Sequence, residues 1–132
     1  MKETSLIASR FKNLREALAD KGLAQLGDTM INFAFSVAKT ARTGYPTGAR
    51  VDNQVLAQAA RQSGLRDIMR SRLDRHDIAD AAEAVLALAW LRDLISIEEL
   101  VAMLADSQLD EIDSMARLIS EVIRRLEKAA EP

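Results

Sequence analysis

The chain has 132 residues, of which 48% are hydrophobic and 29% are charged, and its formal net charge is -2. These values predict one globular domain over residues 1–132 and exclude neither nucleic acid nor small anions as partners. The absence of cysteine excludes disulfides and cysteine-based zinc sites, and a single histidine excludes a histidine-rich metal site. No signal-peptide core and no apolar run of about 20 residues is present, so we expect a cytoplasmic protein without a membrane span.

The first two predicted helices differ in how much of their surface is apolar. Apolar residues recur at three- and four-residue steps near the start of the chain, which predicts one amphipathic helix over residues 6–21. The stretch LGDTMINFAFSVAKTA, residues 26–41, is apolar around nearly its whole circumference and predicts a central, buried helix. Asp28 and Asn32, one turn apart, interrupt this apolar surface.

The middle of the chain is basic. The stretch TGYPTGAR, residues 43–50, predicts a loop, and Asp52 is placed to cap a helix over 53–62. A short basic helix is expected around RDIMRSRL, residues 66–73. Over residues 39–75, eight basic side chains stand against three acidic ones. Such an asymmetry marks either a phosphate-facing surface or a solvated helix face.

The C-terminal part predicts two further helices in the same domain. Ser96 and Glu99 have the spacing of a capping box for a helix over 97–104. A continuous apolar stripe predicts a last helix over 106–129. No segment alternates like a strand, so the predicted fold class is all-α.

Residues 75–94 predict a helix that is apolar on every side yet contains Asp80 and Glu83, three residues apart and on one face. Complementing the helix dipole gains about 0.3–1 kcal/mol, whereas desolvating an uncompensated carboxylate costs several kcal/mol. If both acids are buried, they therefore need either a water-filled cleft or a cation, and the cation is an arginine or a hard divalent ion. Without histidine or cysteine ligands, carboxylates select Mg²⁺ or Mn²⁺. If Asp28 joins the pair, three acids hold the ion against a phosphate, as phosphodiester or pyrophosphate hydrolysis requires.

At these residues the chain resembles the catalytic domain of the ribonuclease III family. KGLAQLGD, residues 21–28, is similar to the family motif E-x-x-E-F-L-G-D, and IADAAEAVLALAWLRD, residues 78–93, is similar to its A-D-x-x-E-A run. RVDNQVLAQAARQSGL, residues 50–65, looks like the segment between the two motifs. The resemblance covers roughly residues 23–94 and is closest to short, stand-alone archaeal members without a double-stranded-RNA-binding domain. It implies a ribonuclease III-type helical bundle.

The resemblance implies a Mg²⁺- or Mn²⁺-dependent endoribonuclease that cleaves double-stranded or structured RNA as a homodimer and acts in RNA processing. It implies that Asp28, Asp80 and Glu83 bind the metal and that Asp28 and Glu83 are catalytic. Asn32, one turn beyond Asp28 on the same face, is placed to support the site directly or through water. Duplex RNA is recognised mainly by its backbone and shape, so basic residues are candidates for phosphate contacts. These candidates are Arg50, Arg61, Arg66, Arg70 and Arg72.

The chain departs from the family motif at three positions. Ala24 stands where the family has a metal-site glutamate, and Lys21 stands where it has an earlier glutamate. Gln25 replaces a phenylalanine that in relatives inserts into the partner subunit. A second hypothesis is therefore a catalytically weakened or inactive relative that serves as an RNA-binding or assembly module.

A third hypothesis is an all-α nucleotide pyrophosphohydrolase. Asp80-x-x-Glu83 and Asp110-x-x-Asp113 would then be its paired acidic helices. This hypothesis leaves the Leu26-Gly27-Asp28 sequence unexplained.

Overall fold

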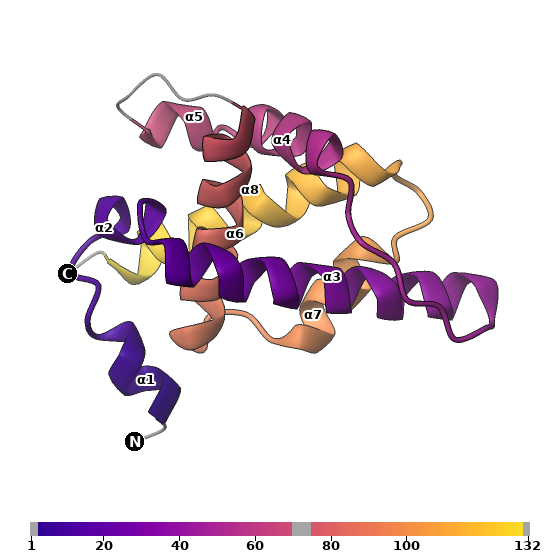
Figure 1. Cartoon of the computed structure of the whole chain (residues 1–132), viewed down its shortest axis with the longest axis horizontal. Helices are drawn as coiled ribbons and strands as arrows, with labels where there is room; N and C mark the ends of the chain where they lie inside the picture. The colour runs from indigo at the N-terminus through magenta and orange to yellow at the C-terminus, as the bar shows by residue number, and fades with distance from the viewer. Residues whose placement is uncertain (1–2, 70–74, 131–132) are drawn as a thin grey trace.

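The protein is described by a computed structural model over residues 3–69 and 75–130 (Figure 1). Within these ranges all regular structure is helical, which confirms the predicted all-α fold class. No described helix is long and apolar enough to cross a membrane. The helices are α1 (Glu3–Ala8), α2 (Leu14–Leu18), α3 (Lys21–Thr43), α4 (Asn53–Gln62), α5 (Leu65–Ile68), α6 (Arg75–Leu91), α7 (Ile97–Leu104) and α8 (Glu111–Ala129).

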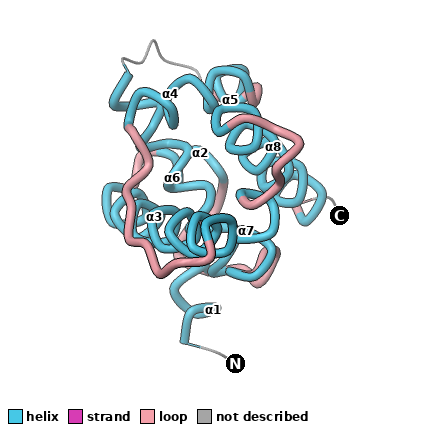
Figure 2. Tube along the Cα trace, turned by 90° about the vertical axis from the view of Figure 1, so that its right-hand side faces the viewer, coloured by secondary structure: helices cyan, strands magenta, loops and turns pink. Residues whose placement is uncertain are grey.

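The centre of the fold is α6, which is surrounded by other helices in both views (Figures 1 and 2). It packs against α1, α2, α3, α4, α5 and α8. Its side chains from 81 to 89 are all buried, as the sequence predicted for a helix that is apolar on every side. Each fully buried leucine or valine contributes about 1.5–3 kcal/mol. Small side chains let the neighbouring helices approach α6 closely, and they are Ala79, Ala81, Ala82, Ala84, Ala87 and Ala89.

The prediction of one helix over residues 6–21 is wrong, because α1 ends at Ala8 and α2 begins at Leu14. The side-chain oxygen of Asn13 accepts a hydrogen bond of 3.0 Å from the Glu16 N–H. The Glu16 carboxylate in turn accepts a bond of 3.1 Å from the Lys12 N–H. These reciprocal caps start a new helix, although the apolar periodicity continues across the break.

The long helix α3 begins earlier than predicted. The Asp20 carboxylate accepts a hydrogen bond of 2.8 Å from the Leu23 N–H, so the helix starts at Lys21. It ends at Thr43 and is capped by Gly44, which has the left-handed conformation with φ 80°. Phe33 is 58% exposed, so the expectation that the whole circumference is buried is wrong on this face.

Several predicted helix boundaries are confirmed. Asp52 caps α4, and Ser96 with Glu99 forms the capping box of α7. The last helix starts at Glu111, after the cap Asp110, rather than at 106. The predicted basic helix is confirmed only as the short α5, and residues 70–73 of that prediction lie outside the described residues.

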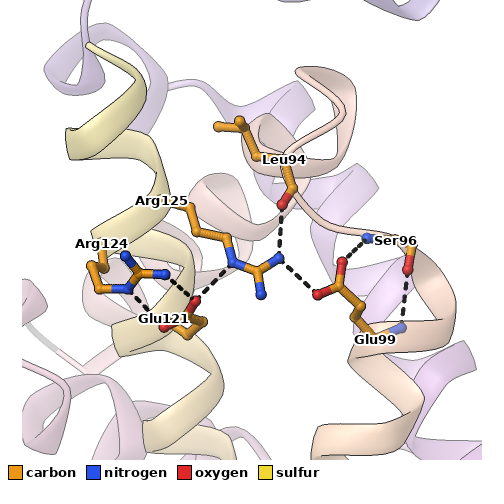
Figure 3. Close-up of polar contacts among 6 residues, drawn as sticks. All are labelled: Leu94, Ser96, Glu99, Glu121, Arg124 and Arg125. Carbon is orange, nitrogen blue, oxygen red and sulfur yellow. Dashed lines mark hydrogen bonds and ion pairs between the residues drawn. The ribbon is translucent and has the colours of Figure 1, made fainter. Parts of the chain in front are cut away.

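A network of charged side chains joins α8 to α7 and to the end of the α6–α7 connection (Figure 3). The Arg125 guanidinium contacts the Glu99 carboxylate at 2.8 Å, the Glu121 carboxylate at 2.8 Å and the Leu94 carbonyl at 2.8 Å. Arg124 and Arg125 together lower the pKa of Glu121 from its ordinary value of 4.5 to about 2. The network therefore stabilises the charged form of Glu121 in the fold.

We expect the Glu121 network to make stability depend on acid pH. The folded protein binds the Glu121 proton more weakly than the unfolded chain does, so the stabilisation is complete above pH 4.5 and is lost as pH falls toward 2. Glu121→Gln should lower the free energy of unfolding at pH 7 by about 1 kcal/mol, and the difference from wild type should shrink below pH 4. Urea titrations at several pH values measure this, and a difference that is constant with pH would contradict it.

Candidate functional site

α3 and α6 cross at Gly27, and their backbones lie very close together there. A Cβ atom on Gly27 would lie 1.9 Å from the backbone carbonyl oxygen of Glu83 and 2.5 Å from its carbonyl carbon. Only a residue without a side chain fits so close an approach. The glycine of the Leu26-Gly27-Asp28 sequence is thus explained by packing, and it brings its neighbour Asp28 beside Glu83.

The carboxyl groups of Asp28 and Glu83 meet at this crossing. Glu83 is buried with 6% exposure, whereas the Asp28 side chain is 43% exposed. Burial, the hydrogen bond to Asp28, and the negative charges of Asp28 and Asp80 raise the pKa of Glu83 to about 9, while Arg50 opposes this rise. Glu83 is therefore protonated at neutral pH and donates a hydrogen bond to Asp28.

Asp80 lies at the edge of this pair, on α6 and exposed to solvent. Its charge raises the pKa of Glu83, so it acts on the same site. Among the residues that the structure describes, no three acidic or histidine side chains form a ready-made group of metal ligands. The structure thus joins Asp28 and Glu83 directly and adds Asp80 through its charge. The metal-binding role of all three remains a prediction.

Asn32 orients Asp28. Its side-chain NH₂ group donates hydrogen bonds of 3.0 Å to Asp28 Oδ1 and 2.8 Å to the Asp28 carbonyl oxygen. Its side-chain oxygen accepts a bond of 2.7 Å from the Val51 N–H. The structure places Asn32 against the Asp28 carboxylate, with its own side-chain oxygen used by Val51, and its role in supporting a metal site stays a prediction.

The predicted phosphate-binding arginines are spread over several elements. Arg50 forms an ion pair of 3.5 Å with Asp28 Oδ2, and its side chain is 79% exposed. Arg61 on α4 is half-buried, and Arg66 on α5 is exposed. Arg70 and Arg72 lie outside the described residues.

An open cavity of about 440 Å³ lies next to Asp80, on the side of α6 that faces the start of α3. Asp77 and Asp80 of α6 and Lys21 and Ala24 of α3 contribute to its wall. Residues of α2 and α5 complete the cavity, among them Leu18 and Ile68. Because Ala24 lines this cavity, a longer side chain at position 24 would have space to enter it next to Asp80.

Two residues near the site were not identified from the sequence. Ser36 and Thr40 of α3 hold the loop that carries Arg50, through hydrogen bonds to Ala49 and Thr47. Together with Asp28 and Asn32 they place a polar side chain at every fourth position along α3. That spacing is the signal that could have identified them.

The side chains that meet at the crossing fit a hard divalent cation. They offer only carboxylate oxygens, which Mg²⁺ and Mn²⁺ prefer, and no histidine or cysteine that would favour zinc. A buried carboxyl such as Glu83 becomes charged at low cost only beside a positive charge. Asp28 and Glu83 are the residues placed to hold such an ion, with Asp80 adding negative charge at the edge.

Comparison with known proteins identifies the same region. A family model described as Ribonuclease III matches residues 21–131. The match starts at the first residue of α3 and includes the crossing of α3 with α6. A search of curated proteins finds no match. Since the family model covers most of the chain and the helical fold agrees with it, this chain belongs to the ribonuclease III family.

Proposed function

We propose that the protein is an endoribonuclease that cleaves double-stranded RNA with the help of Mg²⁺ or Mn²⁺ and takes part in processing structured transcripts. The observation that carries this proposal is the contact of the Asp28 and Glu83 carboxyl groups at the α3–α6 crossing. Membership in the ribonuclease III family supports RNA cleavage as the activity. The family match favours a nuclease over a nucleotide pyrophosphohydrolase.

In this proposal each side chain of the site has a separate task. Asp28 and Glu83 hold the cation, which when bound supplies Lewis acidity toward water and the phosphate oxygens. Asn32 holds Asp28 Oδ1, so the second oxygen of that carboxylate stays directed toward Arg50 and the solvent. The buried position of Glu83 strengthens its electrostatic interaction with the cation, because little water screens it. Asp80 adds negative charge at the solvent side.

The RNA would be bound through its backbone. Arg50 lies beside the acids, and Arg66 is exposed on α5. Contacts of this kind depend on phosphate charge rather than base sequence, so binding should weaken strongly as salt concentration rises. Arg61, Arg70 and Arg72 remain further candidates along the same basic stretch of the chain.

We propose that the active form is a homodimer that uses α3. Gln25 is exposed on α3, and two turns later on the same face Phe33 is 58% exposed. An apolar groove runs near the start of α3 and is lined in part by Ile7, Phe11, Leu23, Leu26 and Leu91. A surface that carries both a protruding aromatic ring and an apolar groove can pair with a second copy of itself around a two-fold axis.

The proposal is tested with the purified full chain, a labelled duplex RNA and Mg²⁺. Single-stranded RNA and duplex DNA of the same sequence serve as controls, and sedimentation gives the mass relative to the chain mass of 14.6 kDa. We expect cutting of duplex RNA that stops when EDTA is added. Ala24→Glu supplies a further carboxylate to the cavity beside Asp80, and we expect it to increase cleavage about tenfold at limiting metal concentration.

Two results would overturn this proposal. Binding of duplex RNA without cutting, in wild type and in Ala24→Glu, would support the RNA-binding or assembly module, which the alanine at position 24 favours. Release of pyrophosphate from nucleoside triphosphates without RNA cleavage would support the pyrophosphohydrolase. In that case the acids at positions 110 and 113 would need a second role, since Asp110 caps α8 and Asp113 accepts a hydrogen bond from Gln62.

A further inference from the structure

The loop between α3 and α4 is fixed to α3 by side chains at regular intervals. We call residues 45–52 the strap; it runs back along α3 toward α4 (Figure 1). Thr40 Oγ1 accepts a hydrogen bond of 2.9 Å from the Thr47 N–H and donates one of 3.2 Å to the Thr47 carbonyl. Ser36 Oγ accepts one of 2.9 Å from the Ala49 N–H and donates one of 2.9 Å to the Ala49 carbonyl. Each hydroxyl thus satisfies both backbone groups of one strap residue.

Asn32 continues the same series at the next position. Its side-chain oxygen accepts the hydrogen bond from the Val51 N–H, and its NH₂ group binds Asp28. Four residues of an α-helix rise about 6 Å, and two residues of extended chain span about 6.6 Å. The helix positions 32, 36 and 40 therefore match the strap positions 51, 49 and 47 in spacing. We call these three α3 side chains the ladder.

The ladder determines where Arg50 lies. Arg50 sits between Ala49 and Val51, and both of these neighbours are held by ladder side chains. Its guanidinium reaches Asp28 Oδ2 at 3.5 Å, and its charge opposes the raised pKa of Glu83. Asn32 of the ladder thus fixes the Asp28 carboxylate. Ser36 and Asn32 fix the backbone of the two residues that flank Arg50. The acid and its counter-ion are placed by one connected set of hydrogen bonds.

The contact between Arg50 and Asp28 is suited to exchange. It is long, and the Arg50 side chain is 79% exposed, so little free energy is lost when it breaks. A divalent cation held by Asp28 and Glu83 would repel the guanidinium from its place. A phosphate oxygen beside the cation would then offer the guanidinium a better partner, because arginine binds phosphate with two parallel hydrogen bonds.

We propose that Arg50 exchanges partners during the reaction and that Ser36 and Thr40 are positioning residues for it. Arg50 balances the charge of Asp28 in the metal-free protein and contacts the scissile phosphate once cation and RNA are bound. This inference rests on the proposed nuclease function. To the phosphate contact already proposed for Arg50 it adds an exchange of partners with Asp28, and it assigns Ser36 and Thr40 the task of holding the backbone next to Arg50.

Metal binding and cleavage should respond to Arg50 in opposite directions. The variants are Arg50→Ala and a control, Arg42→Ala, which removes the same charge from an exposed position at the end of α3. Without RNA, Arg50→Ala should bind Mn²⁺ about threefold more tightly than Arg42→Ala, because a competing cation is gone. At saturating Mn²⁺, its single-turnover cleavage of duplex RNA should be about 30-fold slower. Arg50→Lys should recover part of this loss.

A double-mutant cycle tests the ladder. Ser36→Ala should slow single-turnover cleavage about tenfold in the wild-type background and have little further effect in Arg50→Ala, because both changes remove the same contact. Ser36→Thr keeps the hydroxyl and should restore the rate. If Ser36→Ala does not fold by circular dichroism, Thr40→Val replaces it in the cycle.

The inference is overturned if Arg50→Ala binds Mn²⁺ no more tightly than Arg42→Ala, or if Ser36→Ala has the same effect in both backgrounds. Either result can occur while wild type still binds Mn²⁺ and cuts duplex RNA, which would leave the proposed function intact. If wild type and every variant neither bind Mn²⁺ nor cut RNA, the proposed function fails, and the exchange fails with it.

Discussion

Gly27→Ala is expected to lower the free energy of unfolding by roughly 3–5 kcal/mol, or to prevent folding altogether. Helix propensity alone predicts that the variant is more stable than wild type, since alanine is favoured over glycine by about 1 kcal/mol inside a helix. The added Cβ would lie 1.9 Å from the Glu83 carbonyl oxygen, which is a backbone atom and cannot be moved by a side-chain rotation. α3 and α6 would have to separate, and the buried residues between them would lose contact.

The control for Gly27→Ala is Gly48→Ala. No atom lies within 4 Å of a Cβ built on Gly48, and its φ is not positive, so this variant should differ from wild type by less than about 0.5 kcal/mol. Urea titrations of both variants measure the difference. If Gly27→Ala were as stable as wild type, the close crossing of α3 and α6, and with it the contact of Asp28 with Glu83, would be wrong.

Glu83→Gln is expected to reduce RNA cleavage by a factor on the order of 10³ while preserving the fold. The amide has the size of the carboxyl group and can donate a hydrogen bond to Asp28, as the protonated Glu83 does. It cannot supply the negative charge that a divalent cation requires. The expected result is therefore a folded protein that binds duplex RNA but does not cut it.

Two measurements distinguish a loss of cleavage from a loss of folded protein. Thermal unfolding in EDTA should show Glu83→Gln at least as stable as wild type, because at neutral pH Glu83 must take up a proton when wild type folds, whereas the amide is neutral in both states. Glu98→Gln changes an exposed glutamate of α7 and should leave cleavage unchanged. Cleavage by Glu83→Gln within a few-fold of wild type would show that Glu83 does not serve the reaction.

Helix burial and helix caps were predictable from the sequence, because both depend on residues that are close together in the chain. The burial of α6 followed from apolar residues on all sides, and the caps at Asp52 and Ser96 followed from side-chain type and spacing. The break after α1 was missed because Asn13 caps a new helix without interrupting the apolar periodicity. Phe33 was expected in the core because apolar residues around the whole helix do not show which face of α3 no other helix covers.

The candidate site was predictable as a set of residues but not as an arrangement. Acids inside apolar helices pointed to Asp28, Asp80 and Glu83, the family resemblance gave them a role, and the structure brings two of them into contact. The reason for their contact is the helix crossing at Gly27, which no local pattern contains. The four-residue spacing of the ladder side chains is visible in the sequence, but their hydrogen-bond partners are not, because they are separated by 7, 13 and 19 residues.

We propose that Asp28 and Glu83, joined at the α3–α6 crossing, form the binding site for a divalent cation. The most direct measurement is a crystal structure of the full chain grown with Mn²⁺ and recorded at wavelengths on both sides of the manganese absorption edge. We expect an anomalous peak within coordination distance of both carboxylates and no such peak in Glu83→Gln. A manganese peak elsewhere on the surface, with the Asp28–Glu83 pair still joined by its own hydrogen bond, would show that the pair does not bind the cation.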